Sequence, residues 1–320
     1  MTSVGGPLAW GIFGVVVLAM LAVDLGIFNR KAHVISFKEA ALWSLIWISL
    51  ALAFNVFVFF RFGQESALEF FQAWLIEKAL SVDNLFVFLA AFSFFAVPAH
   101  LQHRVLFWGI LGALVTRGVF IVAGAALLAT FHWVMYAFGA ILILTALRLM
   151  FGADEAVRPD QNPVLRLFRR LVRITPDYDG AHFAVRRDGR WYATPLLMVL
   201  VVIEASDVVF AVDSIPAVFS VTRDVFIVYT SNIFAIFGLR ALCFLVASIV
   251  RRLHYLKPGL ALVLAFVGVK MVLSDKVPIS DLLSLAIVGG IIGLSAFASW
   301  IFAPKENAPS DAAPPGATRP

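Results

Sequence analysis

Residues 77–88 read EKALSVDNLFVF, and residues 204–217 read EASDVVFAVDSIPA. Each stretch places acidic side chains inside a long apolar run. A charge at the centre of a bilayer costs at least about 2.5–3.5 kcal/mol on the insertion scale. If these runs cross a membrane, their charges must face the interior of a helical bundle, where an arginine, a cation or a proton neutralises them.

The composition of the whole chain supports a membrane location. The 320 residues are 62% hydrophobic and 14% charged, with a mean hydropathy of +0.94. Soluble domains are about 45–50% apolar and about 25% charged. The composition excludes a soluble globular enzyme, a disordered chain and a fibrous repeat, and it indicates an all-α polytopic membrane protein. The single cysteine, Cys243, excludes a disulfide framework and a multi-thiolate metal site.

The apolar runs predict about nine transmembrane helices. A spanning helix needs about 20 mostly apolar residues, and these runs are continuous rather than alternating as in a β-barrel. The first run lacks a basic flank and contains Asp24, so we expect a retained helix rather than a cleaved signal peptide. The predicted spans are residues 8–28, 39–60, 70–95, 104–129, 132–151, 194–219, 226–248, 257–273 and 279–301.

The positive charges predict the orientation of these helices. Lysine and arginine are concentrated in alternate loops and in the C-terminal tail, whereas the other loops hold only Arg61, Arg223 and Lys276. Because positively charged loops stay in the cytoplasm, we expect the N-terminus outside and the C-terminus inside. That topology needs an odd number of spans, in agreement with nine. The net charge of +5 is explained by this bias, and we expect no nucleic-acid partner.

The longest loop, residues 152–193, is expected in the cytoplasm. Asn162-Pro163 is a typical helix start. The apolar residues that follow it alternate with four arginines, which predicts a basic amphipathic helix on the anionic surface of the lipid bilayer. Asp188-Gly189 then predicts the turn of a β-hairpin. The tail, residues 304–320, is rich in proline and alanine and is expected to be disordered.

An internal repeat relates residues 70–151 to residues 194–273. Asp83 aligns with Asp207 at an offset of 124, and Arg117 aligns with Arg240 at an offset of 123. Each unit contains three predicted spans, so the two units must insert in opposite orientations. The sequence therefore predicts an inverted three-plus-three helix repeat, as in many secondary transporters, with substrate held between the repeats near the middle of the membrane. Two helices in residues 1–69 and a last helix in residues 274–303 flank the repeats.

The polar residues inside the spans are the candidate functional residues. Carboxylate, amide and carbonyl oxygens suit hard divalent ions such as Mg²⁺, Ca²⁺ or Mn²⁺ rather than zinc or copper. Buried arginines could hold the carboxylates when no cation is bound. The candidate cation ligands are Glu77, Asp83, Asn84, Glu204, Asp207, Asp213 and Ser214, the candidate counter-ions are Arg117 and Arg240, and the candidate accessory residues are Asp24, Lys78 and Asn232.

Helical spacing indicates how these residues would meet. Glu77 shares a helix face with Asn84, and Asp207 shares one with Ser214. Asp213 falls off that face, but Pro216 follows it closely and could break the helix and redirect the aspartate. We therefore expect a broken helix at residues 213–216 and a site built from both repeats. Because Glu77 lies nearer the outer surface than Asp83, it is expected to act as a gate or as an indirect ligand.

The two stretches quoted above resemble the paired signatures of the TerC family of integral membrane proteins, which includes the tellurium-resistance and Alx-type proteins. Residues 189–196, GRWYATPL, and 229–240, YTSNIFAIFGLR, are also similar to the family pattern. The resemblance covers roughly residues 10–303. It implies Mn²⁺ export across the bacterial inner membrane, and it implies links to tellurite resistance and to the response to alkaline pH.

Three functions remain open from the sequence. The first is a divalent-cation exporter that is not an enzyme, needs no cofactor, carries Mn²⁺ and uses protons as a candidate counter-ion. The second is a membrane scaffold or assembly factor whose buried charges hold the fold. The third, an intramembrane hydrolase, has weaker support, because the chain has no His-Glu-x-x-His, Gly-x-Ser-x-Gly or Gly-x-Gly-Asp string. The sequence leaves the oligomeric state open.

Overall fold

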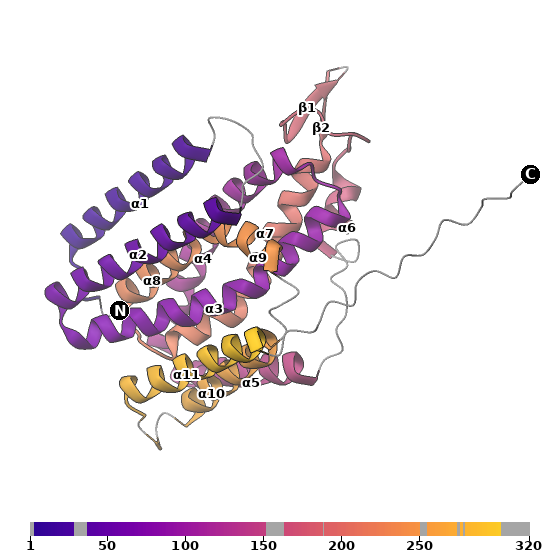
Figure 1. Ribbon diagram of the computed structural model, residues 1–320. Coiled ribbons are helices and arrows are strands. Elements are labelled where there is room, and N and C mark those ends of the chain that lie inside the picture. The colour runs from indigo at the N-terminus through magenta and orange to yellow at the C-terminus, as the bar shows by residue number, and fades with distance from the viewer. Residues whose placement is uncertain are drawn as a thin grey trace, which may run out of the picture.

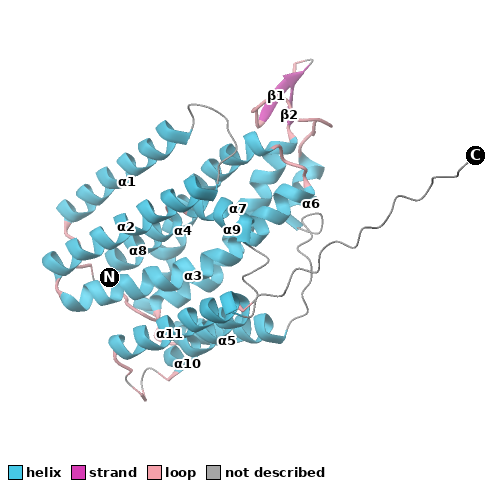
Figure 2. Ribbon diagram, viewed as in Figure 1, coloured by secondary structure: helices cyan, strands magenta, loops and turns pink. Residues whose placement is uncertain are grey.

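A computed structural model describes residues 3–28, 37–151, 163–187, 189–249, 255–273, 276–277 and 279–301. Within these ranges the chain is almost entirely helical, as the composition predicts (Figures 1 and 2). The helices are α1 (Pro7–Phe28), α2 (Phe37–Phe62), α3 (Gln64–Phe94), α4 (Ala99–Thr130), α5 (Val134–Phe151), α6 (Pro163–Leu171), α7 (Pro195–Phe219), α8 (Val225–Ile236), α9 (Leu239–Ile249), α10 (Leu256–Val272) and α11 (Asp281–Ile301). The strands are β1 (Ala184–Arg187) and β2 (Arg190–Ala193).

Five of the described helices are long and apolar enough to cross a membrane: α2, α4, α5, α7 and α11. The bent pair α8–α9 makes a sixth if it is one span. Each of the other predicted spans also contains a helix, but α10 has only 17 residues and α3 carries several intramembrane charges. The chain is therefore a multi-pass helical protein, and the count of nine spans stays a prediction.

Helix α3 lies at the centre of the bundle. It packs against α2, α7 and α8, and α4 packs against α7 on the other side of the same core. Helices α5, α10 and α11 pack together as a layer below α3 in the view of Figure 1. Helix α3 begins at Gln64, six residues before the predicted start, because Gly63 alone separates it from α2 and adopts a φ of +95°. This tight turn brings the start of α3 directly beside the end of α2.

The second half contains a break between two helices, but not at the expected position. Helix α7 runs without interruption through Asp213 and Pro216. Pro216 lies in the last turn of α7, where a missing N–H removes only one intrahelical hydrogen bond. The break falls instead between α8 and α9, where the chain bends by 40°. Gly238 has a φ of +86° there, and a Cβ on it would lie 2.8 Å from the Cβ of Trp47. Only glycine meets both conditions at this point.

The long loop contains both elements that the sequence predicts. Helix α6 starts at Pro163, and β1 pairs antiparallel with β2 so that Arg187 faces Arg190. Gly189 has the positive φ, +75°, that a two-residue turn requires, whereas Asp188 and the predicted disordered tail lie outside the described residues. The loop is tied to α3 because the Tyr178 hydroxyl donates to the Phe95 carbonyl at 2.7 Å. Partial burial raises the pKa of that hydroxyl.

Helices α5 and α10 approach each other more closely than ordinary side chains would allow. A Cβ added to Gly139 would lie 3.0 Å from the Gly268 carbonyl oxygen, and a Cβ added to Gly268 would lie 2.9 Å from the Gly139 carbonyl oxygen. Gly268 also lies beside Ile143, and Gly139 beside Val272. These pairs fit an antiparallel arrangement. Small residues at such contacts let helix backbones pack directly in a membrane.

The close contact predicts a difference between two glycine-to-alanine substitutions. Gly268→Ala should lower the free energy of unfolding by about 1–3 kcal/mol, because its methyl group would meet backbone atoms that cannot move aside. Gly290→Ala is the matched control, since a Cβ at that position in α11 would meet nothing within 4 Å. Thermal unfolding of the purified protein in detergent measures both. Equal melting midpoints for the two variants would contradict the packing of α5 against α10.

Candidate functional site

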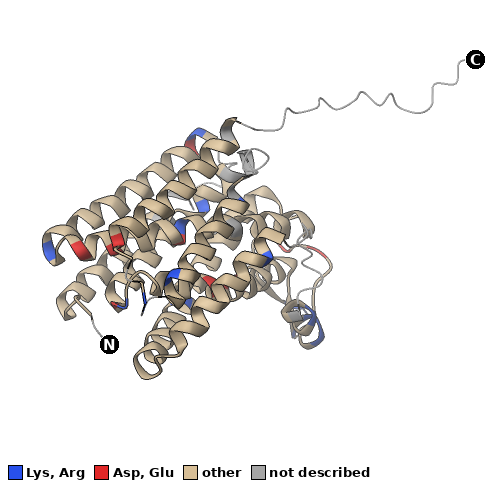
Figure 3. Ribbon diagram, turned by 90° about the horizontal axis from the view of Figure 1, so that it is seen from below, with Lys and Arg blue, Asp and Glu red and all other residues tan. Residues whose placement is uncertain are grey.

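The site lies midway along the central helices. Asp207 is twelve residues from Pro195 at one end of α7 and twelve residues from Phe219 at the other. At a rise of 1.5 Å per residue, it is about 18 Å from each end of the helix. The ribbon is coloured for charged residues in the middle of the bundle as well as at its ends (Figure 3). An acidic residue at this depth has no direct contact with bulk water and needs a partner inside the protein.

Arg117 of α4 is that partner. Its side chain forms an ion pair with Oε1 of Glu77 on α3 and a second one with Oδ1 of Asp207 on α7, at 3.1 Å. The same guanidinium group donates to the Ser214 hydroxyl at 3.1 Å. Arg117 and Glu77 are 0% exposed and Asp207 is 4% exposed. Three helices, two from the first predicted repeat and one from the second, therefore meet at one guanidinium.

The charges of this cluster do not balance. Two carboxylates share one guanidinium, and the second Asp207 oxygen has only the Thr116 hydroxyl, 3.4 Å away. Among the described atoms, Oε2 of Glu77 and Nε of Arg117 are buried without a hydrogen-bond partner. Buried polar atoms are nearly always paired, so such exceptions need an explanation such as a bound water or ion. The cluster has spare negative charge and spare ligand capacity.

The spacing along α7 explains which predicted residues join the cluster. Seven residues after Asp207, Ser214 returns to the same helix face and reaches Arg117. Asp213 lies about 240° round the helix from Asp207, and it accepts a hydrogen bond from Thr145 of α5 at 2.7 Å. The expected redirection of Asp213 by a helix break is therefore wrong, because α7 stays regular. Nothing in the sequence analysis pointed to Thr145.

Glu204 lies one turn from Asp207 and packs over Gly112 of α4. A Cβ on Gly112 would fall within 2.3 Å of all three carboxylate atoms of Glu204, so glycine leaves the room that this side chain occupies. The Glu204 carboxylate is partly buried and lies next to the helix that carries Arg117. It is the nearest additional acid along the cluster's face of α7.

The remaining predicted residues are distributed around the cluster. Asn84 lies two turns from Glu77 on the same face of α3 and is buried. Asn232 of α8 is also buried, and neither of its amide atoms has a hydrogen-bond partner among the described atoms. Arg240 is buried two residues after the break between α8 and α9. The side chains of Asp24 and Asp83 lie outside the described part of the structure.

Two of the candidate residues have partners that the sequence did not predict. Glu77, expected to act as a gate or as an indirect ligand, binds Arg117 directly and shares it with Asp207. The ammonium group of Lys78, a candidate accessory residue, donates to the carbonyl oxygens of Ala235 and Phe237. Within the described ranges, no three acidic, histidine or cysteine side chains converge as a ready metal site. In this conformation the guanidinium of Arg117 takes the place between the carboxylates.

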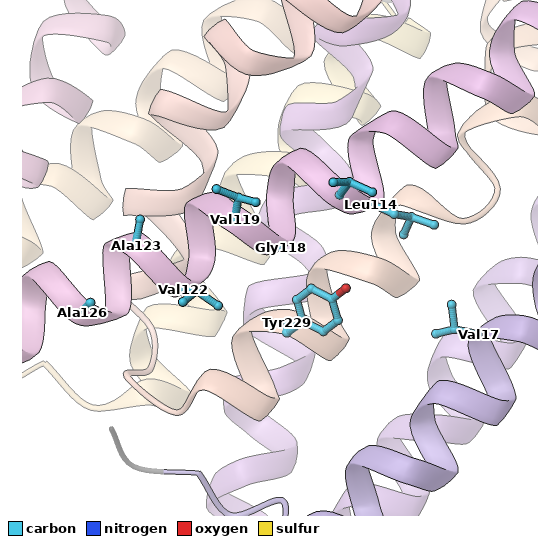
Figure 4. Close-up of a pocket in the computed structure, with 9 residues that line it drawn as sticks. Val17, Leu114, Gly118, Val119, Val122, Ala123, Ala126 and Tyr229 are labelled. Atoms are coloured by element: carbon cyan, nitrogen blue, oxygen red, sulfur yellow. The ribbon is translucent and has the colours of Figure 1, made fainter.

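A groove of about 720 Å³ runs along the outside of α4, between α1 and α8 (Figure 4). Its lining is apolar except for Tyr229, and Val115, Val119 and Val122 are exposed along it. Gly118 lines the groove, one residue after Arg117, but the arginine itself points to the other side of α4 and is fully buried. The groove is therefore an apolar surface feature, and none of the residues of the charge cluster lines it.

Comparison with known proteins identifies relatives over most of the chain. Residues 62–307 match the family model described as the integral membrane protein TerC family. The membrane protein STKORF319 of Myxococcus xanthus is 52% identical over 299 residues, which cover 93% of this chain and 94% of that protein. A protein of Escherichia coli K12 named "putative membrane-bound redox modulator Alx" is 47% identical over 301 residues, which cover 91% and 94% of the two chains. No solved structure matches this chain.

The geometry predicts that Arg117 is required for stability. Arg117→Met should lower the free energy of unfolding by about 3–5 kcal/mol, because it leaves two buried carboxylates without a counter-charge. Arg187→Met is the matched control, since it removes a guanidinium from an exposed pair with Asp179, which is worth at most about 1 kcal/mol. Protein yield and melting midpoint in detergent report both. An Arg117→Met variant as stable as the control would contradict the buried cluster.

Proposed function

This chain belongs to the TerC family of integral membrane proteins, and on that premise we propose that it exports a hard divalent cation, Mn²⁺, across the bacterial inner membrane. The observation that carries the proposal is the buried cluster of Glu77, Arg117 and Asp207, which holds two carboxylates and one guanidinium at mid-depth. Oxygen ligands of this kind suit Mn²⁺. The choice of Mn²⁺ among hard divalent ions comes from the family resemblance.

In this proposal Arg117 is a built-in substitute for the transported cation. It occupies the position between Glu77 and Asp207 when no cation is bound, so the carboxylates are never left unpaired in hydrocarbon. An incoming cation would bind the two carboxylates and displace the guanidinium. Because a hard ion of this size takes about six oxygen ligands, Ser214, Glu204 and Asn84 are the nearest candidates to complete the shell. Protons are a candidate counter-ion for the return step.

The proposal includes an inverted repeat with nine spans and an outward N-terminus. Helix α3 packs against α8 as α7 packs against α4, and these are the pairs that an inverted relation exchanges. The pair of Gly139 and Gly268 corresponds, at an offset of 122, to Ala261 and Ala146, and both alanines are buried. Antiparallel packing of α5 against α10 supports the same relation. Alternating access in such proteins moves one repeat against the other around the substrate.

A membrane scaffold or assembly factor is the second candidate, and one observation favours it. Arg117 already links α3, α4 and α7 by ion pairs, which is what a structural role requires.

The name of the Escherichia coli relative calls that protein a redox modulator. Cys243 is the only cysteine in this sequence and is buried, so this chain cannot form an internal disulfide. We assign the chain to transport rather than to enzymatic catalysis.

Ion uptake into sealed proteoliposomes separates transport from a scaffold role. Purified protein should carry Mn²⁺, and Asp207→Asn or Asp83→Asn should reduce the initial rate by at least about 100-fold, because a cation site loses a charged ligand. Competition with Ca²⁺ and Mg²⁺ tests the assignment of the ion, and a panel of pH gradients tests the role of protons.

The matched control for these variants is Asp179→Asn. It removes the same charge from an exposed ion pair in the cytoplasmic loop and should leave the rate unchanged. Absence of uptake by the wild-type protein would favour the scaffold. Full uptake by a well-folded Asp83→Asn, Asp207→Asn double variant would refute the site.

Labelling from either side of the membrane tests the orientation. In a background without Cys243, Arg170→Cys on α6 should react with an impermeant thiol reagent only from the cytoplasmic side, because positively charged loops stay inside. Glu65→Cys, at the start of α3, should react only from the outside. The reverse pattern would overturn the topology. Both residues are exposed at helix ends, so their labelling reports sidedness rather than burial.

A further inference from the structure

The break between α8 and α9 leaves backbone carbonyl groups without helical partners. Phe237 is the last residue before the turn, and its N–H still bonds to Ile233, whereas Leu242 bonds to Gly238 on the far side. The carbonyl oxygens of Ala235 and Phe237 are therefore at the open C-terminal end of α8. Such groups need donors from elsewhere, since the last four carbonyls of a helix have no intrahelical partner.

Lys78 supplies those donors from α3. Its ammonium nitrogen lies 3.1 Å from the Ala235 oxygen and 3.4 Å from the Phe237 oxygen. A positive charge at this point also complements the partial negative charge at the C-terminal end of α8. Trp47 of α2 stacks on the Phe237 ring at a centroid distance of 5.4 Å and closes the other side of the break. The two contacts together fix the turn between α8 and α9.

The same turn of α3 holds the central cluster. Glu77 and Lys78 are adjacent, so their side chains leave the helix about 100° apart. Glu77 reaches Arg117 of α4, and Lys78 reaches the end of α8. Glu77 and Lys78 leave the same turn of α3, so a displacement of that turn away from Arg117 would also displace the ammonium group of Lys78 from its two carbonyl partners. The charge cluster and the break are mechanically linked through one dipeptide.

We propose that Lys78 is a positioning residue whose hydrogen bonds hold the turn between α8 and α9 in place, an effect that we call pinning of the break. We also propose that the adjacent residues Glu77 and Lys78 couple the loss of the Glu77–Arg117 ion pair to a movement of α9. The pinned break corresponds to the conformation in which Arg117 holds the carboxylates. Release of Glu77 from Arg117 frees Lys78 to leave the carbonyl oxygens, and α9 then moves relative to α8. The pinning stands on geometry alone, whereas its role in transport rests on the proposed function.

The native cysteine reports the state of the break. Cys243 lies in α9, five residues after Gly238, and is 1% exposed. Lys78→Met keeps the length of the side chain but removes the donors, so it should accelerate labelling of Cys243 by a maleimide about tenfold in the absence of metal. Lys78→Arg, which keeps charge and donors, should label within about threefold of wild type. Lys270→Met is the matched control, because Lys270 lies in the last turn of α10 beside Asp281 and should not affect the rate.

Lys78→Gln and the rate of Mn²⁺ uptake give two further readouts. If Lys78→Met does not accumulate, Lys78→Gln retains one amide donor group and should show an intermediate rate of labelling. Labelling of Cys243 at the wild-type rate in folded Lys78→Met or Lys78→Gln protein would overturn the pinning.

In proteoliposomes, Lys78→Met should lower the maximal rate of Mn²⁺ uptake about tenfold with an unchanged KM, because Lys78 positions a helix and does not bind the ion. A changed KM with an unchanged maximal rate would refute the coupling, and an inactive wild-type protein would refute transport while leaving the labelling result intact.

Discussion

The buried guanidinium of Arg117 is the constraint on which the arrangement of the central helices depends. A charge of this kind inside a bilayer has no water to solvate it, so its donors must be met by side chains of neighbouring helices. The carboxylates of Glu77 and Asp207, which belong to two different helices, accept hydrogen bonds from this guanidinium. Their positions fix the rotation of α3 and α7 about their axes, since only one face of each helix carries the required oxygen. The packing of the apolar residues around the cluster then follows from that rotation.

Two internal cations in the described part of the bundle, Arg117 and Lys78, are each paired with oxygen atoms. Arg117 lies between a pair of carboxylates. Lys78, the single lysine of α3, donates to a pair of backbone carbonyl oxygens. Both pairs satisfy groups that would otherwise be costly in hydrocarbon. Both also involve ligands that suit a hard cation. A protein built in this way keeps buried oxygen atoms in contact with internal cations, and that property would serve a transporter as well as a rigid scaffold.

The two predicted repeats differ where their middle spans carry the aligned arginines. Helix α4 is continuous through Arg117, whereas the corresponding segment breaks two residues before Arg240. Gly118 follows Arg117 within a regular helix, and Gly238 precedes Arg240 at a positive φ. Trp47, which belongs to neither repeat, packs directly on the Gly238 turn. A flanking helix thus contacts the chain at the point where the two halves differ.

The sequence by itself determined the membrane class, the helical segments, the amphipathic α6 and the hairpin, because hydropathy, proline and glycine act locally. It also singled out Glu77, Arg117, Asp207 and Ser214, since intramembrane polar residues are costly wherever they lie. Only the tertiary structure decided which of them meet. It placed Asp213 on Thr145 and Lys78 on two carbonyl groups, and it moved the break from Pro216 to Gly238. These outcomes depend on contacts between helices that are distant in the sequence. No local pattern around Gly238 predicts that Trp47 packs against it.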